Sequence, residues 1–156
     1  MAQSLAGCGT GEGRAFSMSP LRSKVRPPDI RVLVVEDDDG AREALVMLVG
    51  TFGVRVHAAR DGREALNILD NVRPDLILCD LQMPRLDGIG FVKWVRQMPP
   101  FHRTLAVAVT GLSRPSDEEV TRQAGFDGHL VKPISREMIA DLLEQAVAKR
   151  PSSPSG

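Results

Sequence analysis

Polar residues that could do chemistry follow four apolar runs of this sequence, each at the same end of its run. Four consecutive acids, Glu36 to Asp39, follow the first run, and Asp80 follows a later one. Thr110 and Lys132 follow two further runs. Carboxylates that cluster repel one another and cost free energy when they are desolvated without a partner, and a hard divalent cation relieves this cost. The pattern predicts a metal-carboxylate site if the fold brings these run ends together.

Magnesium is the cation that such a site favours, because Mg²⁺ takes octahedral oxygen ligands and keeps several of its waters. Two carboxylates and one backbone carbonyl are then enough protein ligands. We expect Asp37 and Asp80 to bind the ion directly. We expect Gln82 to contribute its main-chain oxygen, and Glu36 to act through a water molecule.

A carboxylate beside Mg²⁺ can attack phosphorus and form an acyl phosphate, which makes Asp80 a candidate nucleophile. The metal and the Lys132 ammonium would neutralise the equatorial phosphoryl oxygens, and Thr110 offers a hydroxyl donor. Taken singly, each residue has an ordinary explanation. An acidic run is usually a solvated loop or a helix cap, and we expect Asp39 to be such a cap. Only the combination of residues predicts chemistry.

The elements that must position these residues are predicted from hydrophobic periodicity. Short apolar runs alternate with amphipathic segments, which indicates an α/β protein with a parallel sheet. The expected strands are 30–35, 54–58, 76–79, 105–109 and 129–131. Of the five expected helices, one follows the loop 81–88, and the other four are capped by Asp39, Asp61, Ser116 and Ser135. Glu64 and Glu119 stand three residues after Asp61 and Ser116, which is the spacing of a capping box.

Right-handed crossovers predict a doubly wound five-stranded sheet in the order 2-1-3-4-5. Ligands of such sheets bind at the carboxyl ends of the strands, beside the point where the strand order reverses. Here that point lies between the first and third strands. The acids that follow these two strands are therefore expected to meet there.

The bulk composition indicates one soluble globular domain. The chain has 156 residues, 42% of them hydrophobic and 26% charged, with 20 basic and 20 acidic residues. Zero net charge argues against nucleic-acid binding through a general basic field. Residues 1–28 are rich in Gly, Ser and Pro and carry more basic than acidic residues, so we expect a disordered basic tail. We expect the folded domain to span 29–149 and a second disordered tail to span 150–156.

Cysteine use and hydropathy favour a cytoplasmic location. The two cysteines are Cys8 in the tail and Cys79 in an apolar run, which is no disulfide framework. No apolar stretch approaches the ~20 residues of a membrane helix. The first residues also lack the continuous apolar segment of a signal peptide.

With these residues in place, the sequence resembles the receiver domain of two-component response regulators, such as the chemotaxis response regulator. The resemblance covers nearly all of 30–149, with motifs in the family's order and spacing. The matching stretches are 32–38 (VLVVEDD), 75–84 (DLILCDLQMP), 86–88 (LDG), 109–111 (VTG) and 125–133 (GFDGHLVKP).

The resemblance implies a flavodoxin-like receiver fold and a phosphoacceptor switch in a phosphorelay. Asp80 becomes the phosphorylation site, Glu36 and Asp37 the acidic pair, and Lys132 the active-site lysine. Thr110 becomes the switch hydroxyl, and His129 stands where the family usually has a rotating Tyr, Phe or His. The implied cofactor is Mg²⁺, and the implied donor is a histidine kinase or a histidine phosphotransfer protein. Such a domain catalyses only its own phosphorylation and dephosphorylation.

Some positions depart from the commonest family pattern and leave the output open. The acidic pair is Glu-Asp rather than Asp-Asp, Gly111 follows the threonine, and Gly128 precedes His129. No helix-turn-helix segment follows the fifth helix, so direct DNA binding is not expected. The chain is either a free-standing regulator or a piece of a hybrid kinase or larger regulator. We expect its partner to bind the face formed by 116–124, the fifth strand and 135–149, and a phosphorylation-dependent homodimer is one option.

Two other functions are compatible with parts of this pattern. An aspartate-nucleophile phosphatase of the haloacid dehalogenase kind needs a second aspartate two residues after the nucleophile, and that residue is Gln82 here. A pseudo-receiver, an interaction module that works without phosphorylation, usually lacks an acid, the threonine or the lysine. This chain keeps all of them.

Overall fold

Five parallel strands form one sheet in the order β3-β2-β4-β5-β6, which confirms the predicted order 2-1-3-4-5. The computed structural model describes residues 29–81, 83, 87–111 and 115–150. The tail predicted for 1–28, residues 151–156 of the tail predicted for 150–156, and Gln82 lie outside these described residues. The strands are β2 (Arg31–Val35), β3 (Arg55–Ala59), β4 (Leu76–Asp80), β5 (Leu105–Thr110) and β6 (Gly128–Val131).

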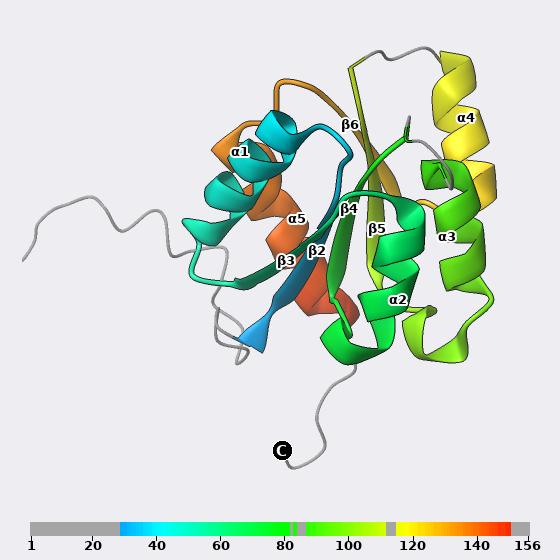
Figure 1. Ribbon diagram of the computed structural model, residues 1–156, viewed down its shortest axis with the longest axis horizontal. Helices are drawn as coiled ribbons and strands as arrows, with labels where there is room; N and C mark the ends of the chain where they lie inside the picture. Colours follow the sequence, from blue (N-terminus) through cyan, green and yellow to red (C-terminus); the bar gives the residue numbers. More distant parts are fainter. Residues whose placement is uncertain (1–28, 82, 84–86, 112–114, 151–156) are drawn as a thin grey trace, which may run out of the picture.

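Helices cover both faces of this sheet (Figure 1). Helices α1 and α5 lie on one face, and α2, α3 and α4 lie on the other. A short 3₁₀ turn at Pro99–Phe101, which the sequence analysis did not predict, connects α3 to β5. The helices are α1 (Asp39–Gly50), α2 (Gly62–Val72), α3 (Gly88–Arg96), α4 (Pro115–Ala124) and α5 (Arg136–Lys149). Among the described residues, no helix is long and apolar enough to span a bilayer.

The two helical layers explain why the strands are apolar without alternation. Along β2, Val32 and Val34 pack into the core under α1 and α5. Leu33 and Val35 pack into the opposite core, under α2, α3 and α4. A strand that is buried on both faces needs apolar residues at every position. Polar residues are therefore confined to the points where such strands end.

The strand register aligns these end points along one edge. Val35 of β2 pairs with Cys79 of β4, so Glu36 is level with Asp80. Asp80 pairs with Val109 of β5, and the next residue of β5, Thr110, pairs with Val131 of β6. The run ends singled out in the sequence therefore meet at the carboxyl edge of the sheet.

Two predicted helix caps were wrong. Asp38, not Asp39, caps α1: the Asp38 carboxylate accepts a hydrogen bond from the Ala41 amide, and Asp39 is the first helical residue. Likewise α4 already begins at Pro115, so Ser116 lies inside its first turn. The helix begins earlier than the predicted cap implies in both cases, by one residue for α1 and by two residues for α4.

The caps of α2 and α5 formed as predicted. Asp61 accepts from the Glu64 amide, and Ser135 accepts from the Met138 amide. The Glu64 side chain also reaches back, to the Arg60 amide at 2.6 Å. Arg150, which the sequence analysis placed in the second tail, is the C-cap of α5 and pairs with Asp75 at 3.0 Å.

Candidate functional site

The acidic residues after β2 lie in a short loop between that strand and α1. Glu36 is 3% exposed, and its amide donates to the Ala59 carbonyl at 3.1 Å, which ties the loop to β3. Its carboxylate accepts from the Asp38 amide at 3.2 Å. Asp37 is exposed. The loop thus buries one acid and presents the next one to solvent.

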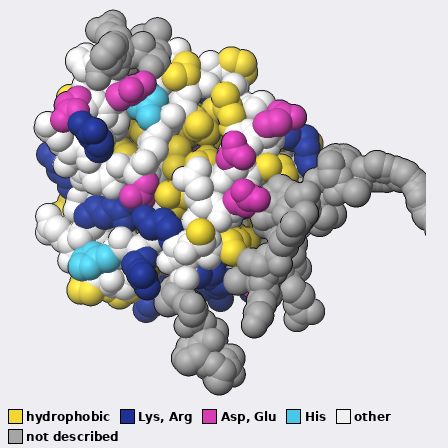
Figure 2. All heavy atoms as spheres, turned by 180° about the vertical axis from the view of Figure 1, so that it is seen from behind, with side chains coloured by type: hydrophobic (Ala, Val, Ile, Leu, Met, Phe, Trp, Pro, Cys, Tyr) yellow, Lys and Arg dark blue, Asp and Glu magenta, His cyan; other side chains and the backbone are white. Residues whose placement is uncertain are grey.

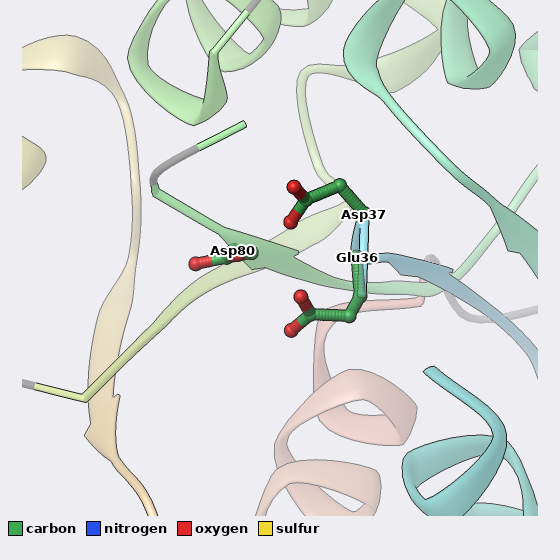
Figure 3. A group of neighbouring side chains, drawn as sticks. All are labelled: Glu36, Asp37 and Asp80. Carbon is green, nitrogen blue, oxygen red and sulfur yellow. The ribbon is translucent and has the colours of Figure 1, made fainter. Parts of the chain in front are cut away.

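Three carboxylates converge where this loop meets the end of β4. Glu36, Asp37 and Asp80 each offer an oxygen within 4.8 Å of the others. Figure 3 shows Glu36 and Asp37 reaching from the β2 end and Asp80 from the β4 end toward one region. An all-oxygen donor set with this excess of negative charge suits a hard divalent cation such as Mg²⁺. The sequence-predicted grouping of these three acids is therefore present.

One ammonium group faces this cluster. Lys132, directly after β6, places its Nζ 3.1 Å from Glu36 Oε1. Burial lowers the pKa of Lys132, but the hydrogen bond and charge of Glu36, with the charges of Asp80 and Asp38, outweigh it and raise that pKa. Lys132 is therefore protonated at neutral pH. It stands ready to contact an anionic group that enters the site.

Backbone contacts hold the last two strand ends together. The Lys132 amide donates to the Thr110 carbonyl at 2.8 Å, and the Lys132–Pro133 peptide bond is cis. Thr110 is 8% exposed at the end of β5. The structure thus brings Thr110 and Lys132 to the same edge as the three carboxylates. Gln82, the predicted carbonyl ligand, lies outside the described residues.

Cys79 lies beside the site but does not belong to it. Burial, followed by the charges of Asp80, Asp87 and Glu36, raises the pKa of its thiol well above the ordinary value. The thiolate is the reactive form of cysteine. Cys79 is therefore a small buried apolar residue, as the sequence indicated.

His129, on β6, faces α4. Its Nδ1 lies 3.5 Å from Thr121 Oγ1, and Thr121 donates its hydroxyl proton to the Glu118 carbonyl at 2.9 Å. That proton is already used, so at this contact Nδ1 is the donor. His129 Nε2 is buried without a hydrogen-bond partner in the described part of the chain. Among the described residues, the one hydrogen-bond contact of the ring is therefore the contact to Thr121 of α4.

Sequence reasoning missed two residues that shape the site. Arg42, on α1, donates to the Glu36 carbonyl at 3.1 Å, and only its i, i+3 spacing from Asp39 hinted at a local contact. Gly88, the first residue of α3, passes close to the backbone of Asp80: a Cβ built on it would lie 2.4 Å from the Asp80 carbonyl oxygen. In the resemblance, Gly88 was only the last residue of the matching stretch 86–88.

We expect Gly88→Ala to destabilise the fold and to disturb Asp80. The added methyl group must displace backbone atoms, and overpacking of this kind costs about 1–3 kcal/mol. Urea unfolding should show the loss, and phosphorylation of Asp80 should slow. The matched control is Gly50→Ala, because a Cβ on Gly50 meets no atom within 4 Å. Equal unfolding midpoints for the two variants would contradict the close approach.

Comparison with known proteins identifies the family. The response regulator receiver domain profile matches residues 32–144. The chain belongs to the response regulator receiver family. A receiver domain is a signalling domain rather than a conventional enzyme. The polar-differentiation response regulator DivK of Brucella anthropi is 35% identical over 104 residues, covering 67% of this chain and 85% of DivK.

Solved receiver structures agree with the fold. The chemotaxis protein CheY4 of Vibrio cholerae superposes with a TM-score of 0.71 at 32% identity, covering 75% of this chain and 98% of CheY4. The receiver domain of a sensor histidine kinase of Pseudomonas aeruginosa, solved with a magnesium ion coordinated in its active-site cleft, superposes with a TM-score of 0.70 at 28% identity. That alignment covers 76% of this chain and 98% of the Pseudomonas domain.

Proposed function

We propose that this receiver domain is a phosphoacceptor switch in which Asp80 takes a phosphoryl group from a histidine kinase or a histidine phosphotransfer protein. One observation carries the proposal: Asp80 ends the central strand within 4.8 Å of two further carboxylates, beside a protonated lysine. Structural acids are seldom packed together in this way, because their mutual repulsion costs free energy. A site that binds a cation and then a phosphoryl group recovers that cost.

The residues that would hold Mg²⁺ are Asp37 and Asp80 directly, Gln82 through its main-chain carbonyl, and Glu36 through water. When bound, the ion supplies positive charge that offsets the charge of the phosphoryl oxygens. The magnesium ion of the related Pseudomonas receiver supports this assignment. The ligand atoms of this chain also suit Mg²⁺, since the three side chains that converge are all carboxylates.

In the proposed transfer, a carboxylate oxygen of Asp80 forms a bond to phosphorus while the N–P bond of the donor phosphohistidine breaks. The electron pair of that bond stays on the donor imidazole. Lys132 exchanges part of its contact with Glu36 for a phosphoryl oxygen, and the Thr110 hydroxyl donates to another. The same groups orient the water that later hydrolyses the acyl phosphate. The domain therefore acts only on itself.

Intact-protein mass spectrometry tests the proposal without the cognate kinase. Acetyl phosphate and Mg²⁺ should add one phosphoryl group to the chain, and excess EDTA should prevent the addition. An unchanged mass under both conditions would instead favour an interaction module that works without phosphorylation.

The proposed output begins with Thr110 and His129. Movement of the Thr110 hydroxyl toward the phosphoryl group frees space beside β5, and the His129 ring moves into it and leaves Thr121. The contact that would be lost is the one between Nδ1 and Thr121 Oγ1, at 3.5 Å. Phosphorylation thus biases an existing two-state equilibrium of β6 and α4.

The partner surface is proposed to comprise α4, β6 and the side of α5 that faces β6. On α5, Asp141 and Gln145 share a side with Lys149 by their four-residue spacing, and Lys149 reaches Asp127, beside β6, at 3.4 Å. Arg136 does not belong to this surface, although it lies within the stretch 135–149 that was predicted to contribute to it. Its guanidinium hydrogen-bonds Thr51 Oγ1 and lies 4.3 Å from the centroid of the Phe52 ring.

The proposed partners are a histidine kinase or phosphotransfer protein upstream and an unidentified protein downstream, which includes a second copy of this chain. Direct DNA binding is not part of the proposal. Similar receivers occur both as separate regulators and within sensor kinases, so either arrangement suits this domain. Both kinds of partner suit a cytoplasmic location.

We expect the phosphoryl mimic beryllofluoride, with Mg²⁺, to shift the amide resonances of Thr121 and His129 along with those of the site. Charge reversal of Arg122 and Asp141 should then change phosphorylation-dependent partner binding by a factor of a few to about 100, the usual range of allosteric coupling. Glu43→Lys with Arg63→Glu, two exposed residues of α1 and α2, is the matched control. Shifts confined to the site, with none at residues 121 and 129, would refute this output route.

A further inference from the structure

Arg42 bridges the two ends of the acidic loop. From the first turn of α1, its Nη1 donates to the Glu36 carbonyl at 3.1 Å and its Nη2 binds Asp39 Oδ1 at 2.5 Å. The Arg42 side chain is 16% exposed, whereas that of Asp39 is 79% exposed. The guanidinium thus lies against the loop and does not extend into solvent. The two residues that it binds stand on either side of Asp37 in the sequence.

The acids of this loop differ in how they are compensated. Glu36 pairs with Lys132 at 3.1 Å, and Asp38 caps α1 through the Ala41 amide at 2.8 Å. Asp39 pairs with Arg42. For Asp37, no hydrogen bond or ion pair is formed within the described part of the chain. Every neighbour of Asp37 in the loop is fixed, while its own carboxylate is left facing Asp80 and Glu36.

We propose that Arg42 is a positioning residue that makes the carboxylate site selective for Mg²⁺ over Ca²⁺, an inference that rests on the proposed function. Mg²⁺ requires a small, near-ideal octahedral shell, whereas Ca²⁺ accepts longer and more variable ligand distances. A loop pinned on both sides of Asp37 cannot widen to suit the larger ion. Loss of the Arg42 contacts lets the loop move, and this lowers the affinity for Mg²⁺ more than the affinity for Ca²⁺.

The decisive variant removes the bridge without changing the local charge. Arg42→Gln combined with Asp39→Asn deletes one positive and one negative charge that lie in contact, so the net field at the carboxylates is nearly unchanged. Asp39→Asn alone is the matched control, because its amide oxygen can still accept from Arg42 and the Arg42 contact to the Glu36 carbonyl stays in place. Arg42→Lys keeps the charge but offers a single donor centre, and it serves as a second test if the double variant folds poorly.

Isothermal titration of the full chain with MgCl₂ and, separately, with CaCl₂ measures the effect. In the double variant we expect Mg²⁺ affinity to fall about 10- to 100-fold, as for other residues that orient metal ligands. Ca²⁺ affinity should fall much less, so the ratio of the two affinities drops. Asp39→Asn should stay within about fivefold of wild type for both ions, because it keeps the hydrogen bond to Arg42 and loses only the charge of an exposed ion pair, which contributes little. Arg42→Lys should lie between the two.

The outcomes separate the two proposals. If wild type binds no Mg²⁺, the proposed function fails and this inference fails with it. If wild type binds Mg²⁺ but the affinities of the double variant for both ions fall equally, Arg42 only supports the fold and the inference alone is wrong. Urea unfolding in EDTA measures any general loss of stability, which cannot by itself change the ratio of the two affinities.

Discussion

Asp80→Asn is expected to abolish phosphoryl incorporation from acetyl phosphate, by at least about 1000-fold, as for the removal of other nucleophiles. The amide nitrogen has no lone pair available for attack, and the amide oxygen is a much weaker nucleophile than a carboxylate oxygen. The substitution barely changes the volume of the side chain. Intact-protein mass spectrometry measures the result directly, as the presence or absence of one added phosphoryl group.

The control for this variant is Asp141→Asn, which makes the same chemical change on the exposed surface of α5. It should incorporate phosphoryl groups at the wild-type rate. A phosphoryl group that persists in Asp80→Asn would assign the acceptor to another residue. Peptide mapping after borohydride reduction, which marks the acyl phosphate, would then identify that residue.

The position of the site could be predicted from the sequence because burial restricts polar residues to strand ends. Strands covered on both faces read as continuous apolar runs, so Glu36 and Asp80 mark where β2 and β4 emerge from the core. The sheet order then follows from right-handed crossovers, and it places these two ends side by side. Neither step needs a side-chain contact to be known.

Which residue of the acidic loop caps α1 could not be predicted in the same way. Asp37, Asp38 and Asp39 are all competent helix caps, so residue type does not choose among them. The choice of Asp38 depends on three-dimensional detail: Glu36 remains buried and binds the Asp38 amide, which fixes where the chain turns into α1. An error of one residue in a cap is the usual result when several neighbours can serve.

Contacts between helices could not be predicted from the sequence either. Arg136 lies in the first turn of α5 and is exposed. The sequence did not show that α1 ends beside Arg136, where Thr51 and Phe52 bind its guanidinium. The contact of His129 with Thr121 is similar, because it depends on how α4 packs against β6. Such contacts decide which charges are available to a partner.

Asp37→Ala is expected to remove both metal binding and phosphorylation. Asp37 is exposed, lies within 4.8 Å of Glu36 and Asp80, and is proposed as a direct ligand. Mg²⁺ holds few protein ligands here and keeps water on its remaining positions, so the loss of one carboxylate removes a large share of the binding energy. Mg²⁺ affinity should fall by more than the ~10- to 100-fold typical of residues outside the metal's own shell.

The matched variant for this prediction is Asp39→Asn, which removes one negative charge from the same loop but from a side chain that is 79% exposed, and which keeps an oxygen that can accept from Arg42. Both variants change the net charge equally, so a general electrostatic effect would weaken Mg²⁺ binding to a similar extent in each. A specific ligand role predicts a large loss for Asp37→Ala and a small one for Asp39→Asn, in magnesium titration and in phosphorylation rate. If Asp37→Ala were phosphorylated at the wild-type rate, the metal would have to be held without Asp37, and Glu36 would be the acid to reconsider as its direct ligand.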